Sequence, residues 1–155
     1  MRLPRASIPT EAEWAGHEGD LDVQYAYRLL YGKTVEEAMP CFVDNRSIER
    51  ADELGFAPRR VFQYYVFAFV RYLSSPASEG DSDCASVFLR LLLRRETDDR
   101  GSVAEIFDAL REAVDHVANN QSFFDADVEI YGDFRDLAAE IKALCKSPGA
   151  QSPAL

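Results

Sequence analysis

The histidines are the first side chains to consider as metal ligands. His116 follows Glu112 by four residues, so the two would lie on one face of a helix and could share a metal. A second such pair would be needed to complete the site. His17 follows Glu13 at the same spacing, but its segment is expected to be irregular. The sequence therefore predicts no metal site, and a solvated helix position for His116.

Three alternating carboxylates resemble the first ligands of a calcium-binding loop. Asp125, Asp127 and Glu129 match the first, third and fifth positions of such a loop. Ile130 then stands where the loop needs glycine, and Asp136 stands where a bidentate glutamate is usual. Because the pattern fails at both positions, we expect no calcium.

The sequence contains no motif for nucleophilic catalysis or for binding a cofactor. Cys41, Cys84 and Cys145 are far apart and form no Cys-x-x-Cys pair, so we expect free thiols in or near the core and a reducing cytoplasm. No Gly-x-Ser-x-Gly elbow and no glycine-rich phosphate loop is present. The sequence thus predicts no catalytic residue and no cofactor.

Charge is the strongest functional signal. The net charge of −10 disfavours binding to nucleic acid or anionic lipid and favours basic partners. Residues 98–140 hold 12 acidic and 3 basic side chains. Four of the carboxylates form a stripe opposite the apolar face of one predicted helix, and they are candidate partner-binding residues: Glu105, Asp108, Glu112 and Asp115. A plain solvated face remains the alternative.

Tyrosines offer a second candidate surface. Tyr27 and Tyr31 are one helical turn apart and could belong either to a binding hot spot or to the edge of the core. Tyr64, Tyr65 and Tyr72 better suit the edge of the core, with a buried ring and a wet hydroxyl.

Helical spacing dominates the sequence. Residues 1–19 predict an irregular arm with one turn that Thr10 and Glu13 cap. The predicted helices cover 21–31, a short segment behind Thr34 that Pro40 ends, 47–55, 58–74, 82–95, 102–118 and 133–145. Their expected caps are Asp20, the Thr34–Glu37 and Ser102–Glu105 boxes, Ser47, Ser82 and Asp133.

The segment 58–74 is apolar on nearly every side, so we expect it at the centre of the fold with Phe67 fully buried. Residues 121–132 alternate and could form one edge strand. The predicted fold is all-α, a single-domain irregular array of about six or seven helices around one central apolar helix. Residues 20–146 form the helical domain, and 147–155 a disordered tail.

Membrane insertion is not expected. The longest apolar run, 61–73, is interrupted by Gln63 and Arg71 and is shorter than the roughly 20 residues of a spanning helix. The N-terminus has no apolar region typical of a signal peptide. The expected location is therefore the cytoplasm.

Two segments carry a family resemblance. They are Leu30-Tyr31-Gly32-Lys33-Thr34-Val35-Glu36-Glu37-Ala38, and Ala51-Asp52-Glu53-Leu54 followed by Pro58 and Phe62-Gln63-Tyr64-Tyr65. Both resemble a group of small uncharacterised acidic bacterial proteins, some of which are similar to immunity proteins encoded beside toxins. The resemblance implies partner binding and brings no catalytic residues.

Together these features predict a non-catalytic, cytoplasmic partner-binding protein, of which an immunity-type inhibitor with an acidic face is one form. The alternatives are an enzyme or regulator with a small-molecule pocket between helices, and a structural subunit that forms a homodimer through its aromatic surface.

Overall fold

The chain is helical throughout the part that the structure describes. The computed structural model describes residues 7–150, and no strand occurs among them. The α-helices are α1 (Leu21–Leu30), α2 (Val35–Ala38), α3 (Ser47–Phe56), α4 (Arg59–Leu73), α5 (Ser82–Asp98), α6 (Phe107–Ala118), α7 (Val128–Tyr131) and α8 (Phe134–Ala150). The 3₁₀ helices are η1 (Glu11–Trp14), η2 (His17–Gly19), η3 (Met39–Phe42), η4 (Pro76–Ser78) and η5 (Ala104–Ile106). The all-α prediction is confirmed, while the described residues hold eight α-helices rather than about six or seven.

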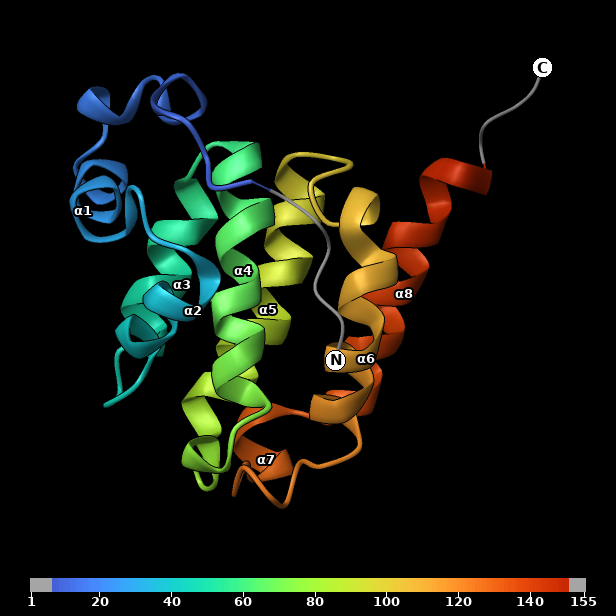
Figure 1. Cartoon of the computed structure of the whole chain (residues 1–155). Helices are drawn as coiled ribbons and strands as arrows, with labels where there is room; N and C mark the ends of the chain where they lie inside the picture. The colour runs from blue at the N-terminus through green and yellow to red at the C-terminus, as the bar shows by residue number, and fades with distance from the viewer. Residues whose placement is uncertain (1–6, 151–155) are drawn as a thin grey trace.

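The helices form two layers (Figure 1). In one layer, α1 contacts α3, α3 contacts α5, and α5 contacts α8. The other layer holds α2, α4 and α6, where α4 contacts both neighbours and also packs on α3 and α5. Contact between α6 and α8 closes the side of the molecule opposite α1.

The core follows α4 closely. Eleven of its fifteen residues are buried, and Phe67 is 1% exposed, as the sequence predicts. The Phe69 ring lies 5.1 Å from the ring of Phe42 and 5.4 Å from that of Phe88, which joins α4 to η3 and α5. The exposed edge of the helix carries Arg60 and Arg71. Burial of large aromatic side chains on this scale is what stabilises the packing of the two layers.

Several predicted helix starts are confirmed. The Asp20 carboxylate accepts the N–H groups of Asp22 and Val23 at the start of α1. Complete capping boxes form at two other starts, by Thr10 with Glu13 before η1 and by Thr34 with Glu37 before α2. These caps depend on residues within four positions of each other, which is why the local sequence is sufficient to predict them.

Three other predicted caps are wrong. Ser47 is the first residue of α3 and does not cap it, and Asp81 rather than Ser82 caps α5 by accepting the N–H of Cys84. The Ser102–Glu105 box does not form, since the Ser102 hydroxyl donates to Asp99 and the Glu105 carboxylate accepts from Arg59 and Gln63. The long helix expected from residue 102 therefore begins only at α6.

The strand considered for residues 121–132 is also wrong. The Asp127 carboxylate accepts the N–H of Glu129 and starts the single turn of α7. Gly132, with φ of 81°, ends it in a conformation that favours glycine. A side chain bound to its own backbone offers the chain an alternative to a strand ladder, and here that alternative prevails.

The expected ends of the helical domain need revision. α8 continues to Ala150, so residues 147–150 are helical rather than part of a disordered tail. The N-terminal arm holds η1 and η2, and Trp14 within it is fully buried. Residues 1–6 and 151–155, the remainder of the predicted arm and tail, lie outside the described residues.

Candidate functional site

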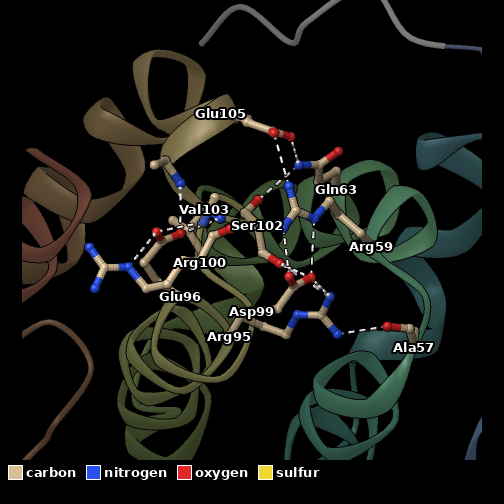
Figure 2. A network of polar contacts seen from close by, with 12 residues as sticks. Ala57, Arg59, Gln63, Arg95, Glu96, Asp99, Arg100, Ser102, Val103 and Glu105 are labelled. Carbon is tan, nitrogen blue, oxygen red and sulfur yellow. Dashed lines mark hydrogen bonds and ion pairs between the residues drawn. The ribbon is translucent and has the colours of Figure 1, made fainter. Parts of the chain in front are cut away.

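A polar network joins the start of α4 to the turn between α5 and η5 (Figure 2). Arg59 donates through Nε and Nη2 to the two oxygens of Asp99, at 3.1 and 2.6 Å, and through Nη1 to Glu105 at 2.9 Å. Gln63 Nε2 donates to the other oxygen of Glu105. Hydrogen bonds from Arg59 and Ser102 lower the pKa of Asp99 to about 2. A carboxyl that ionises so readily is unsuited to act as a general acid.

Two neighbouring residues of α5 extend this network into the interior. Arg95 Nη1 donates to three backbone carbonyls at the C-terminal end of α3: Leu54, Gly55 and Ala57, at 3.3, 3.1 and 2.6 Å. The buried Glu96 carboxylate accepts the N–H groups of Gly101, Val103 and Ala104 at 2.7–2.9 Å. These contacts satisfy backbone groups of the fold, so the network reads as structural rather than catalytic.

Glu53 is the other buried carboxylate with unusual electrostatics. Burial raises the pKa of Glu53, although the hydrogen bonds from Arg50 oppose the shift. Arg50 donates through Nε and Nη2 to its two oxygens at 2.7 and 2.9 Å. A raised pKa is a property of general acids, but this carboxylate is fully occupied by its arginine partner.

The structure separates the four residues of the predicted acidic stripe. Glu105 lies on η5 and binds Arg59, whereas the other three lie on α6. Asp115 pairs with Lys142 of α8 at 2.5 Å, and Asp108 is fully exposed beside Arg111 at 3.1 Å. Glu112 is exposed and has no ion pair with any described residue. Asp108 and Glu112 thus remain directed to solvent, while the other two hold elements together.

The predicted tyrosine pair lies in an aromatic cluster around the N-terminal segment. The rings of Tyr27 and Tyr31 are 4.7 Å apart, and Tyr27 lies 3.9 Å from His17 and 5.4 Å from Trp14. Tyr27 is half-buried, whereas Tyr31 is exposed. Tyr27 therefore packs η1 and η2 against α1, and Tyr31 is the member that faces solvent.

Metal and thiol chemistry gain no support from the geometry. Within residues 7–146, no group of three or more His, Cys, Asp or Glu side chains is placed to hold a metal ion. His116 packs edge-on against Phe124 at 6.0 Å instead. Burial raises the pKa of the Cys84 thiol far above its usual range and that of Cys145 to about 11. Such thiols resist forming the reactive thiolate.

Sequence reasoning missed a groove between α3 and α5. The groove has a volume of about 440 Å³, and its walls include Ile48, Ala51, Val87 and Leu91 together with Arg90 and Arg94. Arg94 lies 5.5 Å over the exposed ring of Phe56 and donates to the carbonyl of Ala51. The spacing of Arg90 and Arg94, one turn apart and next to the apolar run of α5, is the signal that could have identified it.

Sequence reasoning also missed the exposed apolar side chains around α7. Val128 is 53% exposed and Ile130 73%, and Phe123 of the preceding turn also reaches the surface. Asp125, Asp127 and Glu129 alternate with them along the chain. The alternation that suggested a strand is therefore the signal for a surface turn in which apolar and acidic side chains both face solvent.

Comparisons with known proteins give no relative: no family model, no curated protein and no solved structure matches this chain. The resemblance to immunity-like proteins therefore depends only on the segments 30–38 and 51–65 that carry it. Among the described residues, no helix is long and apolar enough to cross a membrane.

Proposed function

We propose that the chain is a non-catalytic binding protein that holds a basic protein partner against its acidic surface. The observation that carries this proposal is a set of exposed carboxylates in residues 98–140 that form no ion pair with any described residue: Asp98, Glu112, Asp125, Asp127, Glu129, Asp136 and Glu140. Only three basic residues occur in the same stretch, and each already lies beside a carboxylate: Arg100, Arg111 and Arg135.

An unneutralised acidic surface has a defined physical effect on binding. It attracts positively charged proteins over about 10 Å at moderate salt and accelerates their capture. It repels nucleic acid and anionic lipid for the same reason. The surface therefore favours a protein partner with a basic face.

The resemblance of segments 30–38 and 51–65 to immunity-like proteins suggests the form of this binding. In our proposal the protein is an inhibitor that covers a basic surface of its partner, and both proteins meet in the cytoplasm. Three unpaired cysteines support a reducing location, where free thiols persist. Fast, charge-driven capture suits an inhibitor that must act before its target does.

The test measures association with the partner recovered by pull-down from the native lysate. Changing Asp108 and Glu112 together to Lys should slow association at least about tenfold at low salt, while the dissociation rate changes little. Wild-type association should also slow as salt rises. Both side chains are exposed, so the melting temperature should change little, although the double change removes the surface ion pair of Asp108 with Arg111.

The matched control is Asp22→Lys on α1, which lies across the molecule from α6 (Figure 1). Asp22 is exposed and forms no ion pair with any residue that the structure describes, so its reversal changes the net charge without touching residues 98–140. Its association rate should stay close to that of the wild type. An unchanged rate in the Asp108 and Glu112 double variant at low salt would contradict the proposed function.

The groove between α3 and α5 favours a second candidate function, a regulator or enzyme that binds a small molecule. Its volume of about 440 Å³ is within the range of ligand pockets, and two arginines could orient an anionic group. Ile48→Trp should fill the groove and abolish ligand-induced NMR shifts at Ala51. If a ligand shifts the NMR signal of Ala51 equally in the wild type and in this variant, the groove is excluded as its binding site.

A further inference from the structure

The α7 loop, defined as residues 121–132, is the most apolar exposed turn of the acidic region. Three of the eight large hydrophobic side chains that are exposed in the described chain fall within it: Phe123, Val128 and Ile130. Single exposed hydrophobic residues need no explanation, but three in one short turn mark an interaction surface. The same turn carries three carboxylates and no basic residue.

The loop is held rigidly despite its lack of long helices. Gln121 Nε2 donates to the carbonyls of Ala126 and Gly132 at 3.0 and 2.8 Å, and Gln121 Oε1 accepts the N–H of Phe134 at 2.9 Å. One side chain thus ties both ends of the loop together. The Gly80 N–H donates to the carbonyl of Phe123 at 2.9 Å. This hydrogen bond holds the backbone of the residue whose phenyl ring is exposed.

The far end of the loop is anchored to α5. The Tyr131 hydroxyl donates to the Asp83 carboxylate at 2.9 Å and lies 3.0 Å from the hydroxyl of Ser82. Arg90 donates to the carbonyl of Tyr131 at 2.9 Å. A loop ordered before binding loses less conformational entropy when a partner docks, so more of its contact energy appears as affinity.

A hollow of about 360 Å³ lies beside Val128, between the loop and the end of α6. Ala118, Ala126 and Val128 give it an apolar wall, and its polar wall includes Asp133 together with its ion-pair partner Arg135, 3.3 Å away. Because this carboxylate is already paired, the hollow offers a partner its apolar wall rather than an unpaired charge.

We propose that the α7 loop is the docking element for the basic partner, with Ile130 entering an apolar recess of that partner and lysine or arginine side chains of the partner pairing with the exposed carboxylates of the loop. This inference rests on the proposed function and names the place where that function is exercised. Asp125 and Glu129, which are exposed and form no ion pair within the described part of the chain, supply the complementary charge.

The experiment titrates the ¹⁵N-labelled full chain with a synthetic amphipathic helical peptide whose apolar face is leucine and whose polar face is lysine. Two comparison peptides replace every lysine by glutamate or every leucine by serine. NMR shifts should concentrate in residues 118–133 with the leucine–lysine peptide and weaken strongly with either comparison peptide. Both apolar and charged contacts are needed for that result.

Variants separate the loop from the rest of the surface. Replacing Val128 and Ile130 together by Ser should weaken peptide binding about tenfold or more, a loss of about 1.4 kcal/mol. Leu21→Ser on α1 is the matched control, since Leu21 is 80% exposed and lies outside the loop. Ile130→Ser alone should weaken binding in the same direction, and because most of this side chain is exposed the substitution should leave the fold intact.

The outcomes distinguish the two proposals. If the lysine peptides bind with shifts confined to α6 and with no effect of the Val128 and Ile130 variants, the docking element is wrong and the acidic-surface proposal stands. If no lysine peptide binds anywhere at low salt, both proposals are wrong. Binding of the leucine–glutamate peptide with equal affinity would also overturn the docking element, because charge would then have no part in it.

Discussion

Arg95 and Glu96 are adjacent in the sequence, yet their side chains fasten two different segments of the fold. Arg95 donates to backbone carbonyls at the C-terminal end of α3, and Glu96 accepts the backbone N–H groups of the turn before η5 (Figure 2). One turn of α5 thereby satisfies the backbone groups that two neighbouring elements leave unpaired. The pair explains how a chain with many short helices keeps its connections in place.

Loss of the Glu96 carboxylate should be severe. Glu96→Ala leaves three N–H groups without a partner, and each buried unsatisfied group costs about 1–3 kcal/mol. We expect the free energy of unfolding in urea to fall by about 3 kcal/mol or more. The exposed Glu112→Ala should change it by less than about 0.5 kcal/mol. A loss below about 1 kcal/mol for Glu96→Ala would show that the turn finds other partners.

Asp99 should confer acid sensitivity on the fold. Its pKa falls from 3.8 to about 2 in the folded chain, so the ionised carboxylate stabilises the fold above about pH 4, and this contribution disappears as the pH falls toward 2. Asp99→Asn should therefore be less stable than the wild type near neutral pH, and the difference should shrink between pH 4 and 2. Urea unfolding across this range measures it, with the exposed Asp98→Asn as the control. A difference that is independent of pH would contradict the assigned cause.

Phe67 should carry a large share of the packing between the layers. Phe67→Ala removes a fully buried ring and should cost about 3–5 kcal/mol through lost contacts and a cavity. Phe56, which is exposed on α3, provides the comparison, and Phe56→Ala should cost less than about 1 kcal/mol. Equal losses for the two variants would place the core elsewhere.

Cys84 should be inert in the folded protein. It is fully buried and its pKa is raised by that burial, so iodoacetamide should not modify it before unfolding. In a variant with Cys41 and Cys145 changed to Ser, mass spectrometry should find no label in buffer and one label in urea. Rapid labelling of this variant in buffer would mean that α5 opens readily from the core.

The sequence predicts the helix caps that depend on neighbouring residues, and it misses the contacts that depend on residues far away in the chain. Asp20 and Thr34 cap their helices as expected, because each needs only backbone groups within the next three residues. Glu105 looks equally suited to a capping box, but Arg59, 46 residues away, takes its carboxylate. No local pattern contains that partner, so the start of α6 was placed too early.

The candidate site divides in the same way. Exposure of Asp108 and Glu112 follows from the amphipathic spacing of their helix. The pairing of Asp115 with Lys142 depends on how α8 packs against α6, which the spacing does not contain. The α7 loop was missed because period-two alternation is shared by strands and by short turns with exposed apolar tips.

The burial of Trp14 makes the N-terminal segment observable in solution. Trp14 is the single tryptophan of the chain, fully buried between the rings of Tyr27 and Tyr65. Its emission spectrum therefore reports on one event, the seating of η1 against α1 and α4. A red shift that precedes the loss of helical circular dichroism on heating would mean that this segment detaches first, as chain ends commonly do. The fluorescence of Trp14 therefore reports, without an added label, on the packing of the N-terminal segment.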